Sequence, residues 1–171
     1  FVVIGFAFKI SAVPFHTWAP DTYQGAPTPV TAFLSVASKT AGFVALVTVV
    51  YVGFPGSSEV WQPVFWILSA LTMTVGNVMA LKQTNIVRML AYSSISHAGF
   101  MMIGIESIGH SGDVEGLPAT LLYLMIYSVL VIGTFTVVSL VTRTGDNSSD
   151  IGSFRGLGKE RPALALAMTV F

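Results

Sequence analysis

Two lysines stand inside apolar stretches near the start of the sequence. Lys9 follows FVVIGFAF, and Lys39 lies in FLSVASKTAGFVALV. A lysine at the centre of a bilayer costs about 2.5–3.5 kcal/mol on insertion scales, so such residues usually face a bundle interior or a hydrated path. Burial favours the neutral amine, which lets a desolvated lysine accept and release protons. We therefore predict a proton relay; the alternatives are a lysine that reaches the membrane surface or one held in a permanent ion pair.

A histidine among hydroxyl groups forms the second candidate. The motif YSSISHAGF places His97 close to Ser93, Ser94 and Ser96 in a later apolar stretch. Imidazole and hydroxyl groups can pass protons between them, and histidine titrates near neutral pH. This pattern predicts that His97 extends the relay and that the serines line its path. A histidine hydrogen-bonded between packed helices fits the same pattern.

Aromatic residues with a polar tip provide weaker candidates. Tyr123 and Tyr127 are four residues apart and share a helix face. They can line the same hydrated path, although packing between helices is the favoured interpretation. Trp18 and Tyr23 are expected at the membrane–water interface, where such side chains are enriched.

Prolines interrupt the first apolar stretch. Proline removes a backbone donor, so VPFHTWAPD cannot continue as an undisturbed helix. The freed carbonyl groups must then be met by protein or water. We predict a helix break at Pro14, His16 and Pro20, with His16 capping the freed carbonyls.

The composition is that of a membrane protein. Of 171 residues, 53% are hydrophobic and 9% charged, the mean hydropathy is +0.76, and soluble domains carry about 25% charged residues. The formal net charge is zero, which argues against nucleic acid as a partner, and there is no cysteine. Metal-binding spacings and nucleotide-binding loops are missing from the sequence. We therefore expect no metal and no cofactor in this chain.

The apolar runs predict an all-α, polytopic transmembrane helix bundle with one discontinuous helix. About 20 apolar residues make one span. The chain begins without Met and ends inside an apolar run, so we interpret it as a fragment of one longer membrane domain. The expected spans are 1–13 with the broken segment 14–27, then 29–53, 60–81, 85–105, 117–141 and 162–171, the last cut short.

The charges outside the first two spans are sorted by side. The basic residues that fall on one side of this layout are Lys82, Arg88, Arg143, Arg155, Lys159 and Arg161. The turns on the other side, near 54–59 and 106–116, contain acidic residues but no lysine or arginine. Because cytoplasmic loops are enriched in lysine and arginine, we expect the basic side in the cytoplasm.

Three long motifs are similar to one known family. These are FKISAVPFHTWAPDTYQGAPTPVTAFLSVASKTAGF, LKQTNIVRMLAYSSISHAGFMMIG and GSFRGLGKERPALALAMTVF. They resemble the proton-translocating, antiporter-like membrane subunits of respiratory complex I, the NADH-quinone oxidoreductase, and within them the subunit N branch. The resemblance covers almost the whole chain. It implies spans seven to eleven and the start of twelve in a fourteen-helix fold with inverted repeats and a discontinuous seventh helix.

The same resemblance implies roles and partners. Lys9 corresponds to the key lysine of helix seven, Lys39 to the relay lysine of helix eight, and His97 to a polar position of helix ten. A glutamate of helix five and a lysine of helix twelve would lie outside the fragment. The implied function is proton pumping driven by electron transfer from NADH, or ferredoxin, to quinone. NADH, FMN, iron–sulfur clusters and quinone would be in or near partner subunits. Sister antiporter-like subunits would be neighbours in the bilayer, which the resemblance implies is the inner membrane of a bacterial cell.

Two other functions remain open. One is a multisubunit cation/proton antiporter without redox partners, which the sequence beyond Phe171 would distinguish. The other is a structural membrane subunit with replaceable lysines. Neutralising Lys39 separates this last function from a pump.

Overall fold

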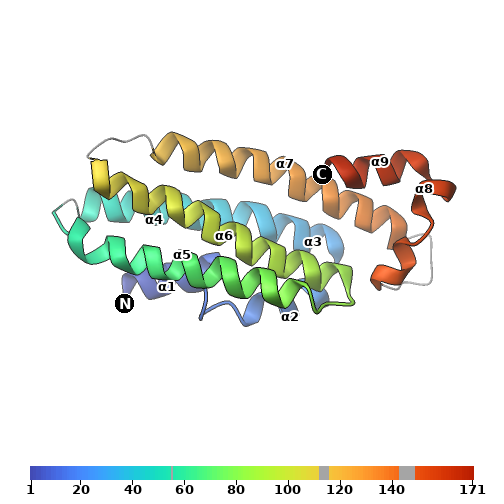
Figure 1. The fold of residues 1–171 in the computed structure, drawn as a ribbon, viewed down its shortest axis with the longest axis horizontal. Coiled ribbons are helices and arrows are strands. Elements are labelled where there is room, and N and C mark those ends of the chain that lie inside the picture. Colours follow the sequence, from blue (N-terminus) through green and yellow to red (C-terminus); the bar gives the residue numbers. More distant parts are fainter. Residues whose placement is uncertain (55, 112–115, 143–148) are drawn as a thin grey trace.

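The computed structural model is a bundle of helices aligned with one long axis (Figure 1). It describes residues 1–54, 56–111, 116–142 and 149–171. In chain order the elements are α1 (Val2–Ile10), α2 (Trp18–Gly25), α3 (Thr28–Phe33), the π-helical turn η1 (Leu34–Ser38), α4 (Lys39–Thr48), the π-helical turn η2 (Val49–Gly53), α5 (Ser58–Ala80), α6 (Ile86–Ser111), α7 (Gly116–Thr142), the 3₁₀ turn η3 (Ile151–Phe154), α8 (Leu157–Glu160) and α9 (Pro162–Val170).

Four stretches of the described residues are long and apolar enough to cross a membrane. They are Thr28–Gly53, Ser58–Ala80, Ile86–Ser107 and Gly116–Thr142. Thr28–Gly53 is a continuous helical stretch because α3, η1, α4 and η2 follow one another without a gap. The chain is therefore an all-α, multi-pass membrane protein, as the composition predicts.

Two predicted boundaries were wrong. Helix α6 continues to Ser111, although we expected a turn from position 106; the added segment ESIGHS contains no proline and keeps its backbone donors. Helix α1 ends at Ile10, three residues earlier than expected. The next residue, Ser11, takes a left-handed conformation with φ 61°, which stops the helix before the first proline.

Glycines bring α5 and α6 together along their length. A methyl group in place of the Gly76 hydrogen would lie 2.7 Å from the backbone nitrogen of Ser96. At Gly99 the added methyl would lie 2.9 Å from the backbone nitrogen of Met73. The Ser69 hydroxyl donates to the Gly99 carbonyl oxygen at 2.9 Å. Small residues allow such close packing, which drives helix association in lipid.

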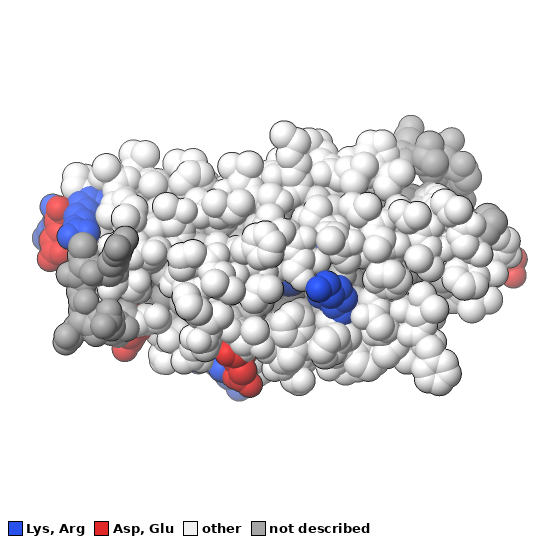
Figure 2. Space-filling view, turned by 180° about the vertical axis from the view of Figure 1, so that it is seen from behind, with Lys and Arg blue, Asp and Glu red and all other residues white. Residues whose placement is uncertain are grey.

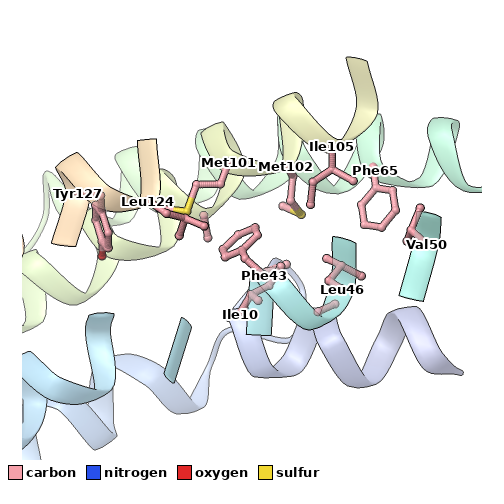
Figure 3. Packing of buried hydrophobic residues seen from close by; sticks show 13 residues of the cluster. Ile10, Phe43, Leu46, Val50, Phe65, Met101, Met102, Ile105, Leu124 and Tyr127 are labelled. Atoms are coloured by element: carbon pink, nitrogen blue, oxygen red, sulfur yellow. The ribbon is translucent and has the colours of Figure 1, made fainter. Parts of the chain in front are cut away.

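A row of large apolar side chains fills the space between α4, α6 and α7. Figure 3 shows Phe43 and Leu46 of α4 facing Met101 and Met102 of α6, with Tyr127 of α7 at one end of the row. All five are almost completely buried. Tyr127 therefore marks the place where the apolar core gives way to polar groups.

The outer surface is suited to lipid. Val60, Trp66, Leu122 and Met125 are exposed, and Figure 2 shows a largely uncharged surface along the bundle, with only isolated charged positions. A contiguous apolar surface of this kind matches the lipid-facing side of a transmembrane bundle.

The basic connections lie at one end of the bundle. The backbone nitrogen of Ile86 donates to Ser149 O at 2.8 Å, and that of Ile151 donates to Thr84 O at 2.9 Å, so the α5–α6 turn touches the segment that precedes α8. Figure 1 shows this turn and α8 at the same end. For the described residues the predicted sorting of charge is confirmed, and Arg143 lies outside them. That this end is cytoplasmic stays a prediction.

We predict that Gly76→Ala destabilises the bundle. Its methyl group would meet the backbone of α6, which cannot move aside as a side chain would, and overpacking of this kind costs about 1–3 kcal/mol. The thermal midpoint of the purified assembly should fall. Gly158→Ala is the control because its methyl would lie 4.0 Å from the Ala165 Cβ, an ordinary contact. Equal midpoints for the two variants would contradict the prediction.

Candidate functional site

Lys39 is buried at the first position of α4, directly after the π-helical turn η1. Its side chain is 2% exposed. The Nζ atom donates to the carbonyl oxygen of Ser94 at 2.8 Å and to its hydroxyl oxygen at 2.5 Å. No carboxylate pairs with Lys39 among the described residues. An amine that is desolvated yet held by neutral acceptors can exist with or without its third proton.

The π-helical turn before Lys39 was not predicted. Such turns occur frequently at functional sites because the extra residue changes the direction of the side chains that follow. The segment LSVAS carries no proline and no other residue type that would mark it. The turn therefore depends on packing against neighbouring helices, and the sequence offered no signal for it.

Ser94 joins α4 to α7. The Tyr127 hydroxyl donates to the Ser94 hydroxyl at 2.8 Å, and both residues are buried. Lys39, Ser94 and Tyr127 thus form one hydrogen-bonded group across three helices. We favoured a packing role for Tyr127, and the structure gives it a buried polar partner as well.

His97 and Tyr123 form a second pair beside the first group. The His97 Nδ1 and Tyr123 Oη atoms lie 2.7 Å apart. The ring centroids of His97 and Tyr127 are 5.2 Å apart, so the two groups touch through their rings. Because residues three apart share a helix face, Ser94 and His97 point toward the same neighbours.

A cavity borders these groups. Its volume is about 210 Å³, and a water molecule takes about 30 Å³ in the liquid. The lining residues are Leu90, Ser93, Ser94, His97, Tyr127, Leu130, Val131, Thr134, Phe135 and Phe171. Ser93 therefore lies at the candidate path. Ser96 does not, because it packs against Gly76 of α5.

Lys9 lies on the neighbouring helix but is not buried in this chain. A methyl group on Gly42 would lie 3.2 Å from Lys9 Cγ, so the Lys9 stem packs one turn away from Lys39. The rest of the Lys9 side chain is exposed. The expected interior position of its amine is not provided by these 171 residues.

The helix break keeps its backbone groups paired. After α1, Ser11 N donates to Phe8 O at 3.1 Å and Ala12 N to Ala7 O at 2.7 Å, the pattern of a Schellman motif. The backbone nitrogen of Val13 donates to Thr72 Oγ1 at 3.0 Å. The connection is thereby anchored to α5 inside the bundle.

The prolines and His16 occupy different places in the break. Pro14 and His16 lie between α1 and α2, whereas Pro20 lies in the first turn of α2, where a missing backbone donor is tolerated. Trp18 Nε1 donates to Phe8 O at 3.0 Å. The side-chain donor at this carbonyl, which also accepts from Ser11 N, is therefore Trp18 and not His16.

Tyr23 was assigned to the wrong environment. It is 1% exposed and packs against α6, so it is covered by protein and cannot contact lipid head groups. Its hydroxyl lies next to Ser94 without forming a hydrogen bond of normal geometry. Tyr23 is thus a site residue that the sequence analysis missed, because its partner is far away in the chain.

The profile of the family described as NADH:quinone oxidoreductase/Mrp antiporter, transmembrane, matches residues 1–171. The chain belongs to this family. Its relatives include NADH-quinone oxidoreductase subunit N of Trichlorobacter lovleyi, 49% identical over 99% of this chain and 34% of the relative. Subunit N of Mycobacterium tuberculosis is 45% identical over 99% of this chain and 32% of the relative. The chain thus spans about a third of these antiporter-family relatives.

Solved structures show the same fold. A chain of respiratory complex I from Thermus thermophilus with bound aureothin has a TM-score of 0.77 and 35% identity, covering 96% of this chain and 34% of that one. A chain of the archaeal membrane-bound sulfane sulfur reductase has a TM-score of 0.88 and 28% identity over 99% and 34%. A chain of the Mrp complex from Dietzia has a TM-score of 0.88 at 24% identity, over 98% and 30%, and shows the antiporter-family fold alone.

We predict that Lys39→Met in the full-length parent chain does not destabilise the assembled protein. Methionine fills a similar volume, and it does not carry the desolvation penalty of a buried ion, which is on the order of several kcal/mol. The thermal midpoint should stay equal or rise. Leu46→Ala, about two helix turns further along α4, is the destabilising control, with an expected cost of about 2–5 kcal/mol. A lower midpoint for Lys39→Met would favour a structural lysine.

Proposed function

We propose that this chain is part of a proton-translocating membrane subunit of an NADH-quinone oxidoreductase. The observation that carries the proposal is Lys39, which is buried, hydrogen-bonded to Ser94 and unpaired with any carboxylate in the described residues. Subunit N relatives from several bacteria support the assignment. An ion-paired lysine would hold its proton permanently, whereas this arrangement lets it change.

In the proposed mechanism, Lys9 and Lys39 gain and lose protons one after the other. Lys9 lies one helix turn from Lys39 across Gly42, and like charges repel more strongly where water is excluded. A positive Lys9 therefore disfavours a proton on Lys39, and a neutral Lys9 permits it. Interacting groups of this kind titrate as a coupled pair. A change at Lys9 is thereby transmitted along the membrane plane.

From Lys39 the proton path continues through hydroxyl groups and a histidine. Ser94 and Tyr127 contact each other directly, and His97 is bonded to Tyr123. No hydrogen bond between His97 and Tyr127 is found in the described residues, so water in the adjoining cavity completes the path. Ser93 lines that cavity. The proposed relay residues are thus Lys9, Lys39 and His97, with Ser93, Ser94, Tyr123 and Tyr127 along the path.

The larger architecture belongs to the same proposal. The chain would form the middle of a fourteen-helix domain with inverted repeats, and α1 with α2 would be its discontinuous helix. Residues outside this chain would then cover the Lys9 side chain. Redox chemistry would occur in partner subunits that hold NADH, FMN, iron–sulfur clusters and quinone. Sister antiporter-like subunits would be the membrane neighbours.

The test uses membrane vesicles that contain the intact complex. With Lys9→Ala or Lys39→Met in the full-length parent chain, quinone reduction and proton uptake should fall together, because a coupled pump stalls when its relay loses a charge. We expect at least a several-fold loss of both. Lys82→Ala is the control, since Lys82 is exposed at the polar end of the bundle. Unchanged proton uptake in the Lys39 variant, with the complex assembled, would disprove the proposal.

The same vesicles distinguish a redox-driven proton pump from a cation/proton antiporter. Without an electron donor, a pump of this type should not exchange protons for sodium or potassium across the membrane. The measurement is the collapse of an imposed pH gradient on addition of either cation. Exchange that depends on Lys39 and needs no electron donor would assign the chain to the antiporters.

A further inference from the structure

Beside Lys39, the hydroxyl hydrogen of Ser94 and the hydroxyl group of Tyr23 lie next to each other. The Ser94 hydroxyl oxygen accepts one hydrogen bond from Lys39 and one from Tyr127, which fills both of its acceptor positions. The Ser94 hydroxyl hydrogen then needs an acceptor. No hydrogen bond donated by Ser94 is found in the described residues. The buried Tyr23 hydroxyl, which likewise has no hydrogen-bond partner in that part of the chain, lies next to Ser94.

We propose that Tyr23 is a positioning residue for Lys39, acting through the hydroxyl of Ser94. The proposal rests on the proton-carrying role of Lys39 given above. When Lys39 is charged, it donates to Ser94, and Ser94 donates to Tyr23. When Lys39 is neutral, its lone pair accepts the Ser94 hydrogen, and Tyr23 turns to donate to the freed Ser94 oxygen.

Tyr23 contributes different amounts of stabilisation to the charged and the neutral forms of Lys39. In the charged state the Ser94 hydroxyl is polarised by the ammonium, and charge-assisted hydrogen bonds are roughly twice as strong as neutral ones. Without Tyr23 a buried donor would remain unpaired. When Lys39 is neutral, the loss of the Tyr23 hydroxyl leaves only one unused acceptor position, on the Ser94 oxygen. Tyr23 therefore stabilises the charged form of Lys39 more than the neutral form.

The second half of the broken helix holds Tyr23 in place. Thr31 donates from its hydroxyl to the Tyr23 carbonyl oxygen at 2.9 Å. On either side of Tyr23 in α2, Asp21 forms an ion pair with Arg88 of α6, and Gln24 accepts from Arg88 at 3.0 Å. A displacement of α2 would move the Tyr23 hydroxyl relative to Ser94. The helix break is thereby connected to Lys39 by a route that does not pass through Lys9.

Several titratable groups surround this contact. Those that face Lys39 or its hydrogen-bond partners are Tyr23 on α2, His97 on α6, Tyr123 and Tyr127 on α7, and Lys9 on α1 across Gly42. Of these, Tyr23 alone lies on the second half of the broken helix. Its removal is therefore a specific test.

The variant is Tyr23→Phe, which removes the hydroxyl oxygen that would accept from Ser94 and keeps the packing of the ring. In vesicles with the complete complex, proton uptake coupled to quinone reduction is measured against pH. Activity falls at alkaline pH when Lys39 can no longer be protonated. Because the variant disfavours charged Lys39, this fall should begin about 0.5–1 pH unit lower, the equivalent of one hydrogen bond. A purely structural role would lower activity at all pH values alike.

Tyr51→Phe is the matched control. Tyr51 also has a buried hydroxyl without a partner in the described residues, but it lies in η2, twelve residues beyond Lys39 and about 18 Å away along the helix. Its pH profile should equal that of the parent. A matching shift in Tyr51→Phe would overturn the proposal.

A double variant tests the route through Ser94. Ser94→Ala should shift the profile in the same direction, and adding Tyr23→Phe should shift it no further, since Tyr23 acts only through that hydroxyl. Additive shifts, or no shift in Tyr23→Phe, would overturn this proposal while leaving the pump intact. Proton uptake that survives Lys39→Met would instead overturn the proposed function on which it rests.

Discussion

A buried amine with no carboxylate partner among the described residues brings several helices of this bundle together. In the described residues the Lys39 ammonium finds its acceptors on α6, at the carbonyl and hydroxyl oxygens of Ser94. The same hydroxyl accepts a hydrogen bond from Tyr127 of α7 and lies next to Tyr23 of α2. Four helices therefore meet at one serine, because a desolvated amine needs hydrogen bonds that lipid and apolar side chains cannot supply.

The break between α1 and α2 is a structured element with its own hydrogen bonds. Ser11 ends α1, Thr72 binds the backbone of the connection, and Trp18 returns to the carbonyl of Phe8. With its backbone groups paired, the chain can change direction inside the membrane without exposing polar atoms to lipid. The break also places the second half-helix against α6, which brings Tyr23 to Lys39's partner.

Close packing of α5 on α6 determines which face of α6 remains for chemistry. Gly76 and Gly99 lie on the shared surface, and Ser96 packs there against Gly76. Ser94 and His97 lie on the other side of α6, toward α4 and α7. The helical repeat thus sorts three nearby polar residues into two environments: Ser96 serves the contact with α5, whereas Ser94 and His97 border the cavity.

The sequence by itself determined the membrane class, the approximate helices, the side that carries the basic residues and the chemically capable residues Lys39 and His97, because hydropathy, proline and isolated charges are local signals. It did not determine the early end of α1 at Ser11, the π-helical turn before Lys39 or the burial of Tyr23. These depend on contacts between residues far apart in the chain. The tertiary structure alone decided that Ser94 contacts Lys39 and borders the cavity whereas Ser96 packs on α5, since only packing shows which helix face meets which neighbour.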